Sequence, residues 1–410
     1  MRSWFRLGPA TLVAAAFIGP GTVVTASLAG ANFGYALLWA LFFSVLATMI
    51  LQEMAARLGI VTGQGLGENL RLLVAQPVLR FVLFVLVIAA IVIGNSAYQG
   101  GNISGASLGA DAIWGNTRFI SAIRQYSGLN PWALMIGIVA AAVLWRGNYR
   151  LIERCLIALV LLMSLAFIST MFLTRPDYAA MLRGVFIPTI PSGATLTVIA
   201  LIGTTVVPYS LFLHAASAAS KWQNTADKAL ALQASSADLR TSIPLGGLIS
   251  VAVVSTAATA YFGHGLAIEN AGDLAVSLEP LFGRSATYLM ALGLLAAGLS
   301  SAVTAPLAAA FALKGILQLS NVQFKATWLG IIGIGVLVSS LGLRPVSVIW
   351  FAQVANGILL PVLVFILLLA ANSSILGKYR NGLRQNVLAS VVLVSTLVLS
   401  GRSLWVAFSG

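Results

Sequence analysis

The sequence predicts an all-α polytopic membrane protein, and three observations lead to that fold class. Of the 410 residues, 59% are hydrophobic and only 8% are charged, whereas a soluble domain carries roughly 25% charged residues. Apolar runs long enough to cross a hydrocarbon core of about 30 Å as helices recur from end to end. The connections between these runs are too short to hold a separate soluble domain. These features exclude a β-barrel, a disordered chain and a cytosolic enzyme.

Eleven membrane-spanning helices are expected, each an apolar run bounded by charged residues or by Gly and Pro. In chain order they lie at 10–31, 36–56, 79–101, 131–146, 152–174, 194–219, 244–263, 285–313, 327–342, 346–371 and 386–407. The single cysteine, Cys155, rules out an intrachain disulfide and a cysteine-rich metal site. We expect the residues before the first span to form a short cytoplasmic segment.

The basic residues predict the orientation of the spans. With the N-terminus in the cytoplasm, 16 of the 23 Lys and Arg residues fall in cytoplasmic segments and 7 in external ones. Basic flanks stay preferentially on the cytoplasmic side, so we expect the N-terminus inside and the C-terminus outside. The same bias accounts for most of the formal net charge of +13. A nucleic-acid partner would need a solvated basic domain, for which the chain leaves no room.

Two spans carry matching interruptions. The first span contains Gly-Pro-Gly-Thr at 19–22, and the sixth contains Thr-Thr-Val-Val-Pro at 204–208. Proline removes a backbone donor and glycine loosens a helix, so both spans should unwind inside the membrane. Each of these spans begins a set of five, and interruptions at corresponding places in two halves indicate a substrate site between inverted repeats. Ordinary proline kinks are the alternative interpretation.

Several stretches of the chain resemble the Nramp transporters. They are GPGTVVTASLAGANFGYALLW (19–39), LQEMAARLGIVTGQGL (51–66), GNYRLIERCLIALV (147–160), GTTVVPYSLFLHAAS (203–217), GLSSAVTAPLAAAFALKG (298–315) and FAQVANGILLPVLVFILLLAANSSILGKYRN (351–381). The resemblance implies a LeuT-like fold in a single transporter domain over 1–410. Its inverted repeats would lie at about 10–175 and 194–371, followed by one extra helix at about 386–407. The short connections favour the inner (plasma) membrane of a bacterium.

The residues that carry chemistry in the Nramp family are replaced in this sequence. By resemblance, the replacements are Gly19 for a metal-binding aspartate, Thr22 for an asparagine, Val207 for a methionine, Tyr209 for a histidine, and Ile88 and Ile91 for acidic residues on a proton route. A second histidine of the family's sixth helix survives as His214. The resemblance therefore implies that the scaffold is kept while the metal and proton groups are changed.

Acidic residues are expected only outside the middle of the membrane, because all ten Asp and Glu lie in connections or near span ends. A divalent cation at the midplane would meet only dipoles, and stripping its water without a counter-charge is costly. The second halves of the two broken helices begin at the gap, where unpaired N–H groups and a positive dipole end favour an anion. We therefore expect hydroxyl and amide side chains there to bind an anion.

The expected substrate-binding residues are those of the two interruptions and the polar side chains beside them. They are Gly19, Pro20, Gly21, Thr22, Val23, Thr204, Thr205, Val207, Tyr209, Ser210, Tyr98 and Gln353. A single hydroxyl can instead bond back to its own helix, and Gln353 can simply bridge two helices. By analogy with sodium-coupled LeuT-like transporters, hydroxyls of the eighth span and carbonyls of the first would hold a sodium ion. These expected sodium ligands are Ala15, Ile18, Ser300, Ser301 and Thr304.

The leading hypothesis from the sequence is a secondary transporter of a small inorganic anion, with bicarbonate as the best fit, which works by alternating access and is either driven by sodium or runs passively. The alternative is a divalent metal cation transporter, for magnesium or manganese, with an altered Nramp-type site. A non-transporting receptor on an inherited fold is a third interpretation. We expect no enzyme, because no catalytic constellation or phosphate loop is found. We expect the substrate and the lipid bilayer as partners, with no nucleic acid and no obligate protein partner. We expect no cofactor except sodium as a coupling ion.

Overall fold

The computed structural model describes residues 18–73, 76–115, 118–147 and 150–409. Throughout these ranges the secondary structure is helical and contains no β-strand, which confirms the all-α prediction. The elements are α2 (Pro20–Phe33), α3 (Leu38–Thr62), α4 (Leu66–Leu73), α5 (Pro77–Trp114), α6 (Arg118–Ser127), α7 (Pro131–Arg146), α8 (Arg150–Thr174), α9 (Tyr178–Phe186), α10 (Thr195–Thr205), α11 (Pro208–Lys221), α12 (Lys228–Tyr261), α13 (Ala271–Val276), α14 (Glu279–Phe282), η1 (Gly283–Ser285), α15 (Ala286–Leu317), α16 (Asn321–Ser339), α17 (Pro345–Ala371), η2 (Ser374–Tyr379) and α18 (Leu383–Ser409).

The helices follow the predicted spans in order. In the described ranges, nine are long and apolar enough to cross a membrane, with α10 and α11 counted together. The shorter α7 is also apolar and has 16 residues. The helix α2 is the second part of the first predicted span, and most of the first part lies outside the described residues. The number of membrane crossings, their orientation and the inverted repeats stay predictions.

The third predicted span, at 79–101, was too short, because α5 extends over 38 residues. Its polar stretch does not end the helix. The Asn95 side chain donates to the Ile91 carbonyl at 2.8 Å, so this polar group is partly satisfied within the helix. The helix also packs against α15, α16 and α17, and this tertiary packing outweighs the weak helix propensity of its Gly and Asn residues.

The seventh predicted span, at 244–263, was also too short, because α12 extends over 34 residues. The side chain of Asp227 accepts hydrogen bonds from the first backbone N–H groups of the helix, which fixes its start. Pro244, taken as a boundary, lies inside the helix. The predicted connections at 102–130, 175–193 and 264–284 contain the short helices α6, α9, and α13 with α14.

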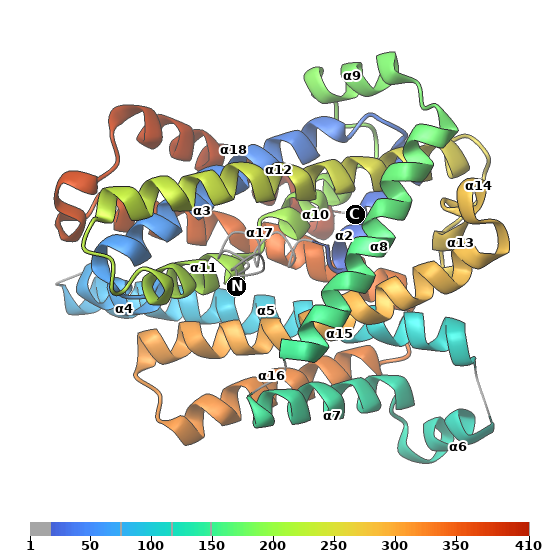
Figure 1. Ribbon diagram of the computed structural model, residues 1–410, viewed down its shortest axis with the longest axis horizontal. Helices are drawn as coiled ribbons and strands as arrows, with labels where there is room; N and C mark the ends of the chain where they lie inside the picture. The colour runs from blue at the N-terminus through green and yellow to red at the C-terminus, as the bar shows by residue number, and fades with distance from the viewer. Residues whose placement is uncertain (1–17, 74–75, 116–117, 148–149, 410) are drawn as a thin grey trace, which may run out of the picture.

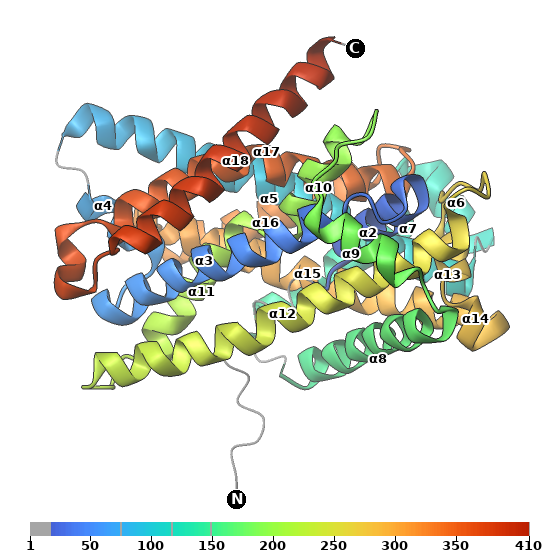
Figure 2. The same cartoon turned by 90° about the horizontal axis from the view of Figure 1, so that it is seen from above.

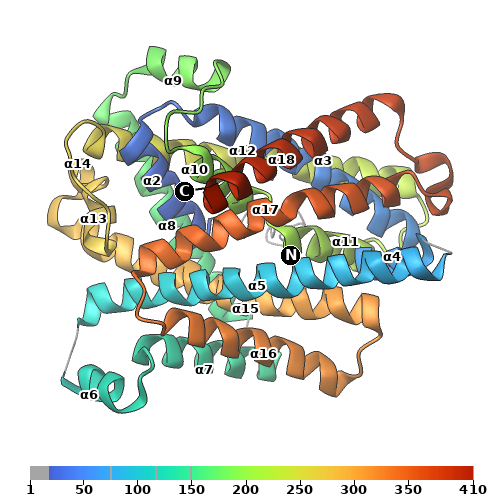
Figure 3. The same ribbon diagram turned by 180° about the vertical axis from the view of Figure 1, so that it is seen from behind.

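The helices form two outer groups with the interrupted segments between them. In Figures 1 and 3, α5, α7, α15 and α16 lie together on one side, and α3, α12 and α18 lie on the other. Between the two groups lie α2, α10, α11 and α17. Seen from above in Figure 2, α18 lies along α17 and its end projects beyond the bundle. This arrangement places the breaks of the chain in the interior.

Two of the prolines inside long helices leave a carbonyl oxygen without its usual partner, because proline has no backbone N–H to offer the residue four positions earlier. Pro306 frees the carbonyl of Ala302 in this way, and the Gln99 side chain of α5 donates to that oxygen at 3.0 Å. Pro361 frees the carbonyl of Gly357, which accepts from the Ser400 hydroxyl of α18 at 3.2 Å. Neighbouring helices therefore satisfy both oxygens and are tied to the bends.

Candidate functional site

The interruption predicted at 204–208 is confirmed. The helix α10 ends at Thr205, α11 begins at Pro208, and Val206 and Val207 between them have non-helical backbone angles. Because Pro208 has no N–H, the carbonyl of Thr204 loses its helical partner. The end of α10 therefore presents carbonyl oxygens and the negative end of a helix dipole to a fully buried gap.

The start of α2 lies at the same level. Gly19 is the N-cap residue, with φ of −90° and ψ of 174°, and Pro20 occupies the first helical position. The carbonyl of Gly19 accepts from the backbone N–H groups of Thr22 at 3.1 Å and Val23 at 3.3 Å. The residues before position 18, which include most of the first half of the predicted span at 10–31, lie outside the described residues. What is described is a helix start, consistent with the predicted interruption at 19–22.

Three helices meet at this point. The hydroxyls of Thr22 on α2 and Thr204 on α10 are hydrogen-bonded at 3.0 Å. The Gln353 amide of α17 lies against Gly21, where a Cβ atom would come within 2.4 Å of Nε2. The backbone of Gln353 lies equally close to α10, since a Cβ on Gly203 would be 2.1 Å from the Gln353 carbonyl oxygen. Glycine at positions 21 and 203 thus allows α2, α10 and α17 to converge.

The side chain of Gln353 has one satisfied end and one open end. Its Nε2 donates to the Ile349 carbonyl at 3.2 Å, whereas Oε1 accepts no hydrogen bond from the described residues although Gln353 is only 1% exposed. A buried amide oxygen without a donor carries a desolvation cost of about 1–3 kcal/mol, unless a ligand or water fills the position. An oxygen acceptor is therefore available at the junction of α2, α10 and α17.

On the α11 side of the break, a chain of hydrogen bonds fixes the polar side chains. The Ser210 hydroxyl donates to the Val207 carbonyl at 2.6 Å and accepts from Gln52 Nε2 at 2.8 Å. The other end of this amide, Oε1, lies 2.7 Å from Nδ1 of His214. Because Oε1 can only accept, Nδ1 carries the proton and Nε2 of His214 is left as a buried lone pair without a partner.

Gln52 of α3 is a residue that the sequence reasoning missed as part of the site. It is fully buried and bridges α3 to two residues of α11. The available signal was a glutamine inside a long apolar span, in the stretch LQEM at 51–54. Polar side chains in such positions are costly unless they pair with one another.

The remaining expected residues divide into those that face the break and those that do not. The rings of Tyr98 and Tyr209 pack at 5.4 Å between centroids and close the α5 side. Thr205 bonds back to the Leu201 carbonyl at 2.9 Å, so its hydroxyl is occupied by its own helix. The other expected substrate residues come together around the break as described; their role in binding stays a prediction.

The expected sodium ligands are only partly described. Ala15 lies outside the described residues, and Ile18 is buried beside the start of α2. On α15, the Thr304 hydroxyl donates to the Ser300 carbonyl at 3.1 Å, while Ser301 is buried. The hydroxyl of Thr304 is thus used within its own helix, and sodium binding at this position stays a prediction.

Among the described residues, no group of three or more His, Cys, Asp or Glu side chains is positioned to hold a metal ion. The acidic residue of α3, Glu53, forms an ion pair with Arg57 at 3.1 Å. Any cation at the break would therefore be held by neutral oxygen atoms. The candidates are the Gln353 amide oxygen, the Thr22 and Thr204 hydroxyls and the carbonyls at the end of α10.

Comparison with known proteins decides the family. A family model described as "Natural resistance-associated macrophage protein-like" (Nramp) matches residues 10–406. The chain belongs to the Nramp family. It is 29% identical over 414 residues to a divalent metal cation transporter MntH of Deinococcus radiodurans, which covers 98% of this chain and 90% of that protein. A transporter of the same name from Yersinia pestis is 31% identical over 318 residues, covering 76% of this chain and 73% of the relative.

Solved structures agree on the architecture. A manganese transporter of Eremococcus coleocola superposes with a TM-score of 0.75 at 21% identity, over 98% of this chain and 88% of the other. Mhp1, a nucleobase-cation-symport-1 family transporter, gives 0.57 at 13% identity over 98% and 93% of the two chains. These similarities confirm the LeuT-like fold. The Nramp chain is a multi-pass protein of the bacterial plasma membrane, as predicted.

The expectation of a small inorganic anion as substrate, with bicarbonate as the best fit, is wrong. The Nramp relatives are named as divalent metal cation transporters, and the structural neighbour is a manganese transporter. The gap contains hydrogen-bond acceptors as well as donors. The N–H groups at the starts of α2 and α11 favour an anion, but the carbonyls at the end of α10 and the open oxygen of Gln353 lie in the same gap. These acceptors oppose an anion and favour a cation.

Proposed function

We propose that this Nramp protein transports a divalent metal cation across the membrane through a site of neutral oxygen atoms. The observation that supports this most directly is the buried Gln353 amide oxygen at the junction of α2, α10 and α17, to which no residue in the described part of the chain donates a hydrogen bond. The names of the relatives point to the same class of substrate. Transporters of this fold use unwound carbonyls and helix C-termini to bind cations.

The chemistry of the donors favours a hard cation that keeps part of its water. Magnesium and manganese accept oxygen ligands, and magnesium loses its hydration shell reluctantly. Because the described residues place no cluster of carboxylates at the break, retained water molecules would lower the cost of bringing a double charge into the membrane. The end of α10 adds a partial negative charge that contributes up to about 2 kcal/mol. The proposed substrate is therefore a partly hydrated ion such as magnesium, in preference to the softer cadmium.

The membrane potential supplies a driving force for such an ion. Two positive charges moving into a cell interior that is negative by 100 mV gain about 4.6 kcal/mol. Inward transport of a divalent cation therefore does not require a second ion, unlike the uptake of an anion. This is consistent with Ile88 and Ile91 of α5, which offer no proton-binding group. The sodium hypothesis thereby loses the argument that motivated it.

Uptake by the full-length protein in proteoliposomes tests the proposal. We expect saturable uptake of magnesium and manganese that rises with an inside-negative potential. Gln353→Leu removes the open oxygen and should lower magnesium uptake about tenfold, because a charge-assisted contact contributes about 1.5–3 kcal/mol. Gln223→Leu, at an exposed glutamine after α11, is the matched control and should behave as wild type. Absence of saturable divalent uptake, or full uptake by Gln353→Leu, would exclude the proposed site.

A further inference from the structure

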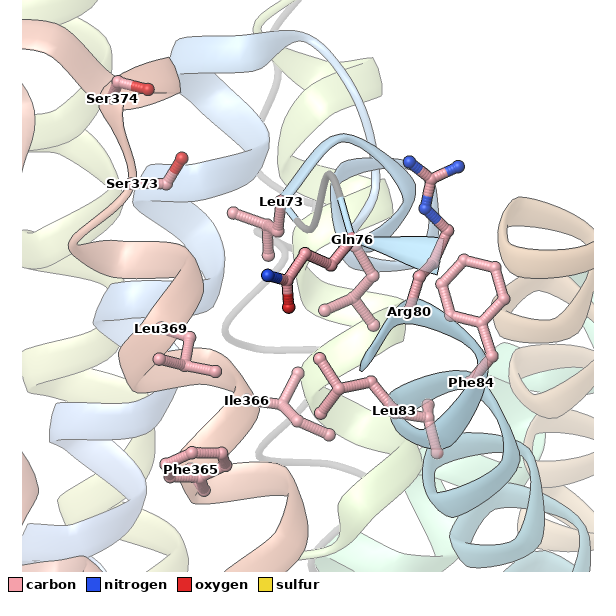
Figure 4. A pocket seen from close by; sticks show the side chains of 12 residues that line it. Leu73, Gln76, Arg80, Leu83, Phe84, Phe365, Ile366, Leu369, Ser373 and Ser374 are labelled. Carbon is pink, nitrogen blue, oxygen red and sulfur yellow. The ribbon is translucent and has the colours of Figure 1, made fainter. Parts of the chain in front are cut away.

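A cavity of about 590 Å³ opens where α5 begins and α17 ends. Gly105 and Ile349, where these two helices also approach each other, lie at the opposite ends of α5 and α17. Its walls come from α4, from the first turns of α5 and from the last turns of α17 and the residues after it (Figure 4). This volume lies in the range of cavities that hold small molecules. The proposed cation site does not use any of its lining residues.

Apolar side chains line most of this cavity, including Leu73 near the level of Ser373 and Phe84 beside Arg80 in Figure 4, and its charged and hydroxyl groups gather toward one end. Leu83, Phe365 and Ile366 lie toward the opposite end in Figure 4, with further apolar walls from Leu70 and Val87. At the polar end in Figure 4, the Arg80 guanidinium points toward the level of the helix ends, as do the hydroxyls of Ser373 and Ser374. A cavity with an apolar interior and a polar mouth at the helix ends is complementary to an amphipathic ligand.

Positive charge is concentrated in a second cavity that shares a residue with the first. The second cavity, of about 810 Å³, shares Arg80 with the first and adds Arg71, Lys314 and one carboxylate, Glu68. Three cations thus face one acid. In addition, the Arg380 guanidinium donates to the Ser373 carbonyl at 3.0 Å beside the first cavity. A ligand whose polar end is negatively charged would find its complement here.

The cavity also adjoins surface that is suited to lipid. On the first turns of α5, Val78 is 77% exposed and Phe81 is 68% exposed, and Val85 next along the helix is exposed as well. In a membrane such a face contacts hydrocarbon. The cavity therefore lies between a lipid-facing helix surface and a cluster of basic side chains at the level where the helices end.

We propose that this cavity binds a phospholipid with an anionic headgroup. An acyl chain occupies the space between α5 and α17, and the phosphate pairs with Arg80, Arg71 and Lys314. Clusters of basic residues at the membrane surface bind acidic lipids through such pairs. A soluble anion would not use the apolar walls, and a zwitterionic lipid would not use the excess of positive charge.

The position of the lipid gives it a structural consequence. The helix α5 carries Tyr98 and α17 carries Gln353, so both helices reach from this cavity to the break. A lipid between their ends holds them apart at one end of a shared seam. Occupancy of the cavity therefore changes how α5 and α17 can approach each other, whatever ion the protein carries.

Native mass spectrometry of the full-length protein tests the proposal. Detergent-purified protein is incubated with phosphatidylglycerol, with phosphatidylcholine of identical acyl chains, or with glycerol phosphate alone. We expect one phosphatidylglycerol to be retained in preference to phosphatidylcholine, and no retention of glycerol phosphate. Retention of glycerol phosphate alone would assign the basic cluster to a free phosphate and overturn the lipid proposal, and so would equal retention of both lipids.

Two variants and one control locate the lipid. Arg80→Gln should lower phosphatidylglycerol retention about fivefold, the usual effect of one basic residue beside an acidic lipid. Leu83→Trp, at a half-buried wall residue, should reduce retention of both lipids by filling the cavity. Arg154→Gln, at an exposed arginine of α8, should retain lipid as wild type does. Thermal unfolding confirms that each variant is folded, and if Leu83→Trp fails this check Arg80→Gln decides. Unchanged retention in Arg80→Gln, or an equal loss in Arg154→Gln, would refute the site.

Discussion

The close packing at the junction of α2, α10 and α17 can be tested directly by adding a methyl group at each of its two glycines, Gly21 and Gly203. In Gly21→Ala the new Cβ would lie 2.4 Å from Gln353 Nε2, about 1.0 Å short of an ordinary contact of 3.4 Å. In Gly203→Ala it would lie 2.1 Å from the Gln353 backbone oxygen, about 1.3 Å short. The first clash involves the end of a flexible side chain, and the second involves the backbone of a helix.

The two variants should therefore fail in different ways. In Gly21→Ala the Gln353 amide moves aside at little cost in stability, and we expect magnesium uptake in proteoliposomes to fall about tenfold because the oxygen leaves its position. In Gly203→Ala the helices α10 and α17 must separate, and overpacking of this kind lowers the free energy of unfolding by about 1–3 kcal/mol. Fluorescence-detected thermal unfolding in detergent measures that loss.

Gly330→Ala is the matched control, because a Cβ at this position of α16 meets nothing within 4 Å. It should leave uptake unchanged and raise helix stability slightly, since alanine favours a helix by up to about 1 kcal/mol over glycine. Full uptake by Gly21→Ala would show that the Gln353 amide is not held where the cation passes. A melting temperature of Gly203→Ala equal to that of wild type would refute the close approach of α10 and α17.

Three further substitutions test the site and its supports. Gly19→Asp places a carboxylate at the N-cap of α2, where the backbone angles accept any residue; it should lower the KM for manganese uptake about tenfold, and an unchanged KM would place the ion elsewhere. Gln52→Leu leaves His214 without its partner and should lower the free energy of unfolding by about 1–3 kcal/mol in thermal unfolding; equal stability would contradict the bridge. Arg57→Met removes the charged donor to Asn381 and should lower the free energy of unfolding by about 2 kcal/mol while exposing the connection at 374–382 to proteolysis; unaltered digestion would exclude this contact.

The spans and the break of the sixth helix could be predicted because they depend on apolar length and on proline, both of which are visible in the sequence. Pro208 begins a new helix as expected, whereas Pro244, expected at the start of the seventh span, lies inside α12. The same residue type had opposite outcomes because the continuation of a helix depends on its neighbours in the bundle. The direction in which each side chain of a helix points could not be predicted either. Thr204 faces α2, but the adjacent Thr205 bonds back to its own helix.

The sign of the substrate charge was the largest error, and it arose from acceptors that carry no formal charge. A carboxylate is visible in a sequence, but a carbonyl at the end of α10 becomes an acceptor only through the geometry of the break. The open oxygen of Gln353 likewise depends on which end of the amide is satisfied by Ile349. Gln52 was missed for a similar reason, since its two partners lie more than 150 residues away along the chain.

The hydrogen bond from the Ser400 hydroxyl to the carbonyl of Gly357 ties α18 to the interior helix α17. Gly357 lies one turn along α17 from Gln353, so α18 is bonded to α17 beside the residue proposed to bind the cation. A shortened chain that lacked α18 would leave this oxygen facing hydrocarbon with no donor, because Pro361 removed the one that a continuous helix supplies. Any movement of α17 during transport must therefore carry α18 with it or break this hydrogen bond.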